Sequence, residues 1–126
     1  MEKVLGRFAS QAYALLRIVA GLLFACHGAQ KLFGVLGWPG GGHAPYMSQF
    51  GLAGVIEFFG GLMIATGFFA GFAAFIASGE MAFAYFKTHA PRGTWPIQNG
   101  GELALLYCFI FLYLACRGTV TWGVKR

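Results

Sequence analysis

Long apolar stretches alternate with short glycine- and proline-containing segments along the whole chain. The apolar stretches cover residues 13–33, 50–67, 69–86 and 103–116. Each is apolar on all sides rather than along one stripe, which is typical of helices surrounded by lipid. The last stretch is short for a span of about 17–25 residues, and extension into Gly101 and Gly118 or local thinning of the bilayer would accommodate it. The pattern predicts an all-α fold, a four-helix transmembrane bundle.

The connections between these stretches are of two kinds. Residues 67–71 form a tight turn between the second and third stretches, whereas residues 34–49 and 87–101 are longer and rich in glycine and proline. Four spans place both long loops on one side of the membrane and both termini on the other. Because binding residues concentrate on loops held by a rigid scaffold, we expect the side with the long loops to carry the specialised surface.

The composition fits a membrane protein with a single domain over residues 1–126. Of the 126 residues, 58% are hydrophobic and only 10% are charged, whereas about 25% are charged in a typical soluble domain. A soluble domain of this size has too much surface for its volume to bury so many apolar side chains. The lipid bilayer is therefore the expected surroundings.

The net charge of +5 does not predict a nucleic-acid partner, because the basic residues are not gathered on a soluble face. They flank the apolar stretches, as topology-setting charges do. The side of the termini carries Lys3, Arg7, Arg117, Lys125 and Arg126, and the other side carries Lys31, Lys87 and Arg92. This excess predicts cytoplasmic N- and C-termini. The chain begins like a signal peptide, but Arg17 interrupts the apolar region, and we interpret this segment as a retained first helix.

Small residues recur at helical spacing in the first two stretches. The stripe in the first stretch is Gly21, Ala25 and Gly28, and the second stretch holds Gly54, Gly60 and Gly61. Small residues let helix backbones approach closely in lipid, so these positions predict helix packing.

Arg17 shares a helical face with Phe24 and Lys31, and we expect this face to point into the bundle. No acidic residue lies at the depth of Arg17 in the predicted topology. Its partners are then backbone carbonyls, a lipid phosphate or a second protein.

Three of the four acidic residues lie inside or at the rim of apolar stretches, where an ionisable group is costly and by default marks a working site. At about 1.5 Å per residue, Glu57, Glu80 and His27 fall roughly 10 Å below the outer rim, with Lys31 and Glu102 just above them. The sequence thus predicts one polar ligand-binding pocket, formed by His27, Lys31, Glu57, Glu80 and Glu102. Arg17, Trp95 and Asn99 are secondary candidates.

Simpler interpretations of the same residues stay open. Lys31 can extend to the headgroups, and His27 can be a hydrogen-bonded core residue. Asn99 and Glu102 have the spacing of a capping box at the start of the last helix. Glu57 and Glu80 must pair with a cation, accept hydrogen bonds or remain protonated.

The sequence predicts neither a metal site nor a haem. A haem with two histidine ligands needs two histidines within the membrane, and only His27 is placed there. The three cysteines, Cys26, Cys108 and Cys116, have no CxxC or metal-ligand spacing, and we expect them to behave as small hydrophobic residues. Because nothing in the sequence carries electrons, an accessory subunit is favoured over a stand-alone oxidoreductase.

In these motifs the chain resembles the DoxX family of small four-helix bacterial membrane proteins. The shared pieces are Arg17-x-x-x-Gly21, His27-Gly28-x-x-Lys31, Glu57-x-x-Gly60-Gly61 with Gly67, Glu80-Met81-Ala82, and Pro96-x-x-Asn99-Gly100-Gly101-Glu102-x-Ala104 with Tyr107. The resemblance implies a four-helix bundle in the bacterial inner membrane. Family names derive from a terminal quinol oxidase and a thiosulfate:quinone oxidoreductase, which implies a link to redox metabolism.

The first functional hypothesis is a site for a quinone or another amphipathic ligand in the outer half of the bundle. Glu57 or Glu80 would accept a proton from a quinol hydroxyl, and His27 or Lys31 would hydrogen-bond the ligand oxygen. The ring would lie against aromatic side chains, which such pockets need: Phe58, Phe59, Phe83 and Trp95.

Two alternatives belong to other classes. A non-catalytic membrane subunit would dock a redox partner protein through Arg17 or the loops. A proton-coupled transporter is weaker, because the chain has only four predicted spans and no visible inverted repeat, although a homo-oligomer would double the spans.

Overall fold

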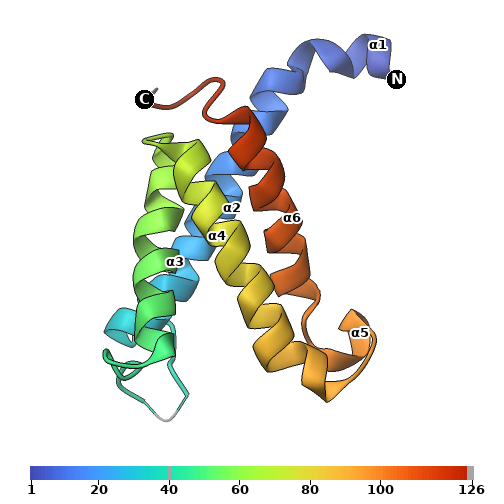
Figure 1. The fold of residues 1–126 in the computed structure, drawn as a ribbon. Helices are drawn as coiled ribbons and strands as arrows, with labels where there is room; N and C mark the ends of the chain where they lie inside the picture. The colour runs from blue at the N-terminus through green and yellow to red at the C-terminus, as the bar shows by residue number, and fades with distance from the viewer. Residues whose placement is uncertain (40, 125–126) are drawn as a thin grey trace.

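The computed structural model describes residues 1–39 and 41–124, and all the regular secondary structure in this part of the chain is helical (Figure 1). The elements in chain order are α1 (Glu2–Leu5), η1 (Gly6–Phe8), α2 (Ala9–Phe33), α3 (Gln49–Thr66), α4 (Ala70–Ala84), the π-helix η2 (Tyr85–His89), η3 (Ala90–Arg92), α5 (Pro96–Asn99) and α6 (Glu102–Arg117). The predicted all-α class is confirmed. Two of the basic residues used to predict the topology, Lys125 and Arg126, lie outside the described residues, as does Gly40 of the first long loop.

Local sequence explains where the long helices end. α2 and α3 are both followed by a glycine with positive φ, Gly34 at 72° and Gly67 at 88°, whose N–H bonds back to the helix carbonyls of Gln30 and Met63. This left-handed conformation suits glycine and stops a helix. At the other end of α3, the hydroxyl of Ser48 accepts the N–H of Gly51, as an N-cap residue does.

α2 and α3 pack backbone against backbone through their glycines. A Cβ placed on Gly21 would lie 2.7 Å from the carbonyl oxygen of Gly61, and one on Gly61 would lie 2.5 Å from the backbone nitrogen of Ala25. A Cβ on Gly28 would overlap the backbone of Phe58. The predicted small-residue packing is therefore confirmed for these positions, whereas no described residue outside its own helix lies within 4 Å of such a Cβ on Gly60.

α4 forms a second pair with α6. The hydroxyl of Ser78 on α4 donates to the carbonyl of Cys108 on α6 at 2.7 Å. Buried alanines of α4, including Ala73, Ala74 and Ala77, belong to the core of the bundle. The three cysteines are free.

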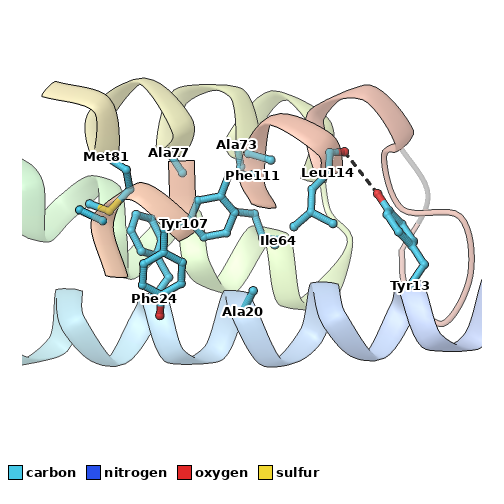
Figure 2. Close-up of a cluster of buried hydrophobic side chains, with 12 residues drawn as sticks. Tyr13, Ala20, Phe24, Ile64, Ala73, Ala77, Met81, Tyr107, Phe111 and Leu114 are labelled. Carbon is cyan, nitrogen blue, oxygen red and sulfur yellow. Dashed lines mark hydrogen bonds between the residues drawn. The ribbon is translucent and has the colours of Figure 1, made fainter. Parts of the chain in front are cut away.

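The core lies between the two helix pairs and is aromatic at its centre (Figure 2). The rings of Phe24 and Phe111 are 4.7 Å apart, and Tyr107 stacks on Phe111 at 5.2 Å. Contacts of this kind add to the stability gained by burying the rings themselves. Ile64, which is fully buried, completes this centre from α3.

The two helix pairs meet at the turn between α3 and α4 and separate toward the opposite end (Figure 1). The outward surfaces remain apolar, with exposed side chains such as Leu22 on α2, Leu52 on α3, Phe75 on α4 and Phe109 on α6. Two helical segments, Glu2–Phe33 and Gln49–Thr66, are long and apolar enough to cross a membrane. α4 and α6 are shorter, with 15 and 16 residues.

Candidate functional site

A cavity of about 480 Å³ lies in the part of the fold where the two helix pairs separate. Its lining comes from all four long helices and from η2, and it is mostly apolar. Four of the five residues predicted to form the polar pocket line it together: His27, Lys31, Glu57 and Glu80.

Lys31 and Glu57 form an ion pair on the wall of the cavity. The Nζ atom of Lys31 donates to Oε1 of Glu57 at 2.6 Å, and their side chains are 17% and 3% exposed. Gly54, one turn before Glu57, makes room for this pair, because a Cβ there would lie 3.1 Å from Cβ of Lys31. A buried pair of this kind is strongly coupled, since removal of one partner leaves the other charge uncompensated.

Glu80 brings a second carboxyl group to the same pair from α4. Its carboxyl lies close enough to Glu57 and Lys31 to interact electrostatically with both. The Oε1 atom of Glu80 is buried and has no hydrogen-bond partner among the described residues. Only Glu57 pairs with the ammonium group of Lys31, so the carboxyl group of Glu80 lies beside this pair without a cation of its own.

Aromatic side chains form the floor and walls of the cavity. Phe24 and Tyr107 belong to the core and also line the cavity. The half-buried ring of His27 is edge-on to the ring of Tyr107, with 6.1 Å between the ring centres. Phe50 and Phe83 line the cavity nearer the surface, so the predicted role of Phe83 as a wall residue agrees with its position.

The other predicted aromatic walls are elsewhere. Phe58 packs against Phe33 and Phe59, and neither Phe58 nor Phe59 lines the cavity. The reason is helix geometry, because consecutive residues point about 100° apart and only Glu57 of these three faces inward. Trp95 is 64% exposed and also lies outside the lining.

The π-helix η2 adds polar side chains to the lining of the cavity. These are Lys87, Thr88 and His89, and Gln49 at the start of α3 also lines the cavity. π-Helical turns are rare and are found frequently at functional sites. From the sequence, His89 was expected in a loop and Lys87 only among the charges that set the topology.

Glu102 does not join the other four residues. It is exposed at the first position of α6 and is absent from the cavity lining. The capping-box interpretation is also wrong, because the N-cap of α6 is Gly101 and not Asn99. The acidic side chain is instead in the first turn of the helix, where a negative charge is favourable.

Asn99 organises the loop between α4 and α6 instead of contacting the cavity. It is 2% exposed, and its amide nitrogen donates to Tyr85 Oη at 3.2 Å and to the carbonyl of Gly93 at 3.1 Å. Its side-chain oxygen accepts the N–H of Gly101 at 2.8 Å. Asn99 thereby holds the end of α4 against the start of α6.

Arg17 lies at the other end of the molecule and is fully buried. Its guanidinium donates to four carbonyl oxygens, those of Ile64 and Ala65 at 2.7 Å and those of Thr121 and Trp122 at 2.9 Å. Of the three partners left open by the sequence, backbone carbonyls are the ones found. The prediction that Arg17 docks a partner protein is wrong, because no part of its side chain is accessible.

Some lining residues that the sequence analysis missed carried a usable signal. Phe24 lies on the face of α2 that was predicted to point inward, and Tyr107 follows Ala104 and precedes Phe111 at helical spacing.

Within residues 1–39 and 41–124, no three histidine, cysteine or acidic side chains gather as metal ligands would.

Four long helices with an apolar outer surface, and a cavity holding buried ionisable groups, define a helical membrane protein. The DoxX family model matches residues 12–90, and the chain belongs to this family. An uncharacterized protein of Haemophilus influenzae (strain ATCC 51907 / DSM 11121 / KW20 / Rd) is 45% identical over 109 residues, which cover 83% of this chain and 81% of that protein. No solved structure matches the chain.

Proposed function

We propose that this protein binds a quinone or a similar ring-bearing amphipathic ligand in the cavity, as an accessory component of redox metabolism. The observation that carries the proposal is the buried Oε1 of Glu80, which has no hydrogen-bond partner among the described residues and lies beside the Lys31–Glu57 pair in a cavity of about 480 Å³ with aromatic walls. Ligand pockets typically combine such apolar walls with a few convergent polar groups.

Each polar residue has a distinct role in this proposal. Glu80 accepts a hydrogen bond from a ligand hydroxyl, and Lys31 or His27 donates one to a ligand oxygen. The ring lies between Phe24, Tyr107 and Phe83, which line the cavity from three helices. The apolar tail leaves between α3 and α4, where Leu52 and Phe83 are 62% and 60% exposed while also lining the cavity.

The proposal includes a membrane topology, in which a ligand reaches the cavity from the lipid. We propose a multi-pass protein of the bacterial inner membrane, in which α2, α3, α4 and α6 are the four spans and both termini are cytoplasmic. The described basic residues on the side of the termini are Lys3, Arg7 and Arg117. On the opposite side Lys31 is neutralised by Glu57, which leaves Lys87 and Arg92 and supports the proposed orientation.

A redox partner protein would contact the long loops. Both loops expose apolar side chains, with Met47 at 101% in the first and Trp95 and Ile97 at 64% and 78% in the second. Copurification of a stable oxidoreductase, lost on replacing Trp95 and Ile97 by serine, would support this role.

The test of ligand binding uses a short-chain quinol analogue and the purified protein in lipid nanodiscs. Glu57→Gln and Glu80→Gln should each weaken binding by about tenfold or more. Glu80→Gln removes the charged group that accepts the ligand hydrogen bond, and Glu57→Gln lets Lys31 move to the carboxylate of Glu80. Glu102→Gln is the matched control, because it makes the same change at an exposed position outside the cavity. Thermal unfolding checks that each variant is folded. Equal binding by all three variants, or no binding by the unmodified protein, would refute the proposal.

A further inference from the structure

We infer that the cavity also binds a lipophilic organic cation, with Glu80 as the counter-ion. This inference goes beyond quinone binding. It depends only on the cavity, on the charges of its lining and on its aromatic walls.

The charge balance comes from three side chains. Lys31 is already paired with Glu57 at 2.6 Å, so these two groups neutralise each other. Glu80 adds a carboxyl group with a buried oxygen that no described residue satisfies. When Glu80 is ionised, the group of three carries one uncompensated negative charge in apolar surroundings, and a ligand cation removes that cost.

The other basic side chains of the lining do not supply this cation. They are His27 on α2 and Lys87 and His89 on η2. Lys87 is exposed, and its Nζ lies 6.0 Å from the centre of the Phe83 ring. His89 hydrogen-bonds the carbonyl of Asn99 through Nδ1 at 3.2 Å, and His27 stands edge-on to Tyr107.

The walls suit a cation with an apolar body. Phe24, Phe83 and Tyr107 line the same cavity as Glu80, and aromatic ring faces attract cations, most strongly where water is excluded. Phe24 and Tyr107 are 1% and 5% exposed, so this part of the cavity is well shielded. A carboxylate beside aromatic rings is the combination that recognises alkyl- or aryl-substituted onium ions.

The probes for the test have the same shape and opposite charge: tetraphenylphosphonium and tetraphenylborate. Binding to the protein in nanodiscs of uncharged lipid, above the partitioning into empty nanodiscs, is expected for the phosphonium and not for the borate. Equal binding of both ions would show that shape and apolarity decide, and it would overturn the inference.

Variants of the charged residues should act in opposite directions. Glu80→Gln should weaken phosphonium binding by about tenfold or more, because it removes the counter-ion. Lys31→Gln should strengthen it, because Glu57 then lacks its own cation and adds a negative charge. A purely structural role for these residues would weaken binding in both variants, which would also overturn the inference. Glu102→Gln should bind as the unmodified protein does.

The same samples distinguish this inference from the proposed function. If the unmodified protein binds the quinol analogue but not tetraphenylphosphonium, only the inference of a cation site is refuted. Phosphonium binding in the predicted pattern, without quinol binding, supports the cation site and removes only the quinone proposal.

Discussion

Arg17 on α2 donates through Nη2 to the carbonyl oxygen of Thr121, 104 residues further along the chain, at 2.9 Å. The same side chain holds the last turn of α3 through Ile64 and Ala65. One guanidinium therefore joins the first long helix, the second, and the segment after the last. Two further bonds support this segment, from the hydroxyl of Thr119 to the carbonyl of Gly67 at 2.7 Å and from the N–H of Val124 to the carbonyl of Thr66 at 2.8 Å.

Replacement of Arg17 by lysine should destabilise the protein by about 2–3 kcal/mol, because an ammonium group keeps the charge but cannot reach four carbonyls in a fork geometry. The measurement is thermal or denaturant unfolding in detergent, together with chymotrypsin cleavage at Trp122, which should become faster. Arg7→Lys makes the same change at an exposed position and should leave both unchanged. An unaltered rate of cleavage in Arg17→Lys would show that the arginine does not hold the C-terminal segment.

Alanine at Gly28 should disrupt the packing of α2 against α3. A Cβ there overlaps the backbone of Phe58, which cannot move without separating the helices. We expect a loss of about 2 kcal/mol or more, in the range of overpacked cores. Gly60→Ala is the control within the same helix pair, because no atom of residues 1–39 and 41–124 outside its own helix lies within 4 Å of its added Cβ. That substitution should be neutral or stabilising by up to about 1 kcal/mol, since alanine favours a helix over glycine. Equal stability of the two variants would contradict the backbone-to-backbone packing.

Alanine at Asn99 should loosen the loop between α4 and α6 more than it destabilises the helices. The substitution removes bonds to Tyr85, Gly93 and Gly101, each worth about 1 kcal/mol, from a site that is 2% exposed. Hydrogen exchange over residues 85–101 should accelerate, whereas exchange in α2 and α3 should not. Gln98→Ala, at the exposed neighbouring position, should leave the exchange unchanged. Uniform acceleration in all helices would mean that Asn99 acts on global stability and not on the loop.

The helices could be predicted closely from the sequence. The predicted stretch 50–67 corresponds to Gln49–Thr66, and the stretch 103–116 corresponds to Glu102–Arg117. Glycines with positive φ end α2 and α3, so a local signal marks these boundaries. The stretch 69–86 was less regular than expected, because α4 ends at Ala84 and passes into a π-helix that has no clear sequence signature.

The candidate site could be predicted only in part. Depth along each helix predicted that His27, Lys31, Glu57 and Glu80 lie at one level, and all four line one cavity. Depth alone also suggested Glu102, which points outward at the start of α6. The direction of a side chain depends on how its helix is rotated, and the packing of neighbouring helices determines this rotation.

The sequence by itself determined the helical class, the approximate ends of the long helices and the small-residue surface between α2 and α3. These features depend on residues near one another in the chain, through apolar runs, helix-stopping glycines and helical spacing. Only the tertiary structure decided that Lys31 pairs with Glu57, that Oε1 of Glu80 has no hydrogen-bond partner among the described residues, and that Arg17 binds carbonyls of α3 and of the segment after α6. These contacts join residues that are far apart in sequence, and they form because burying a charged group is favourable only where a partner satisfies it.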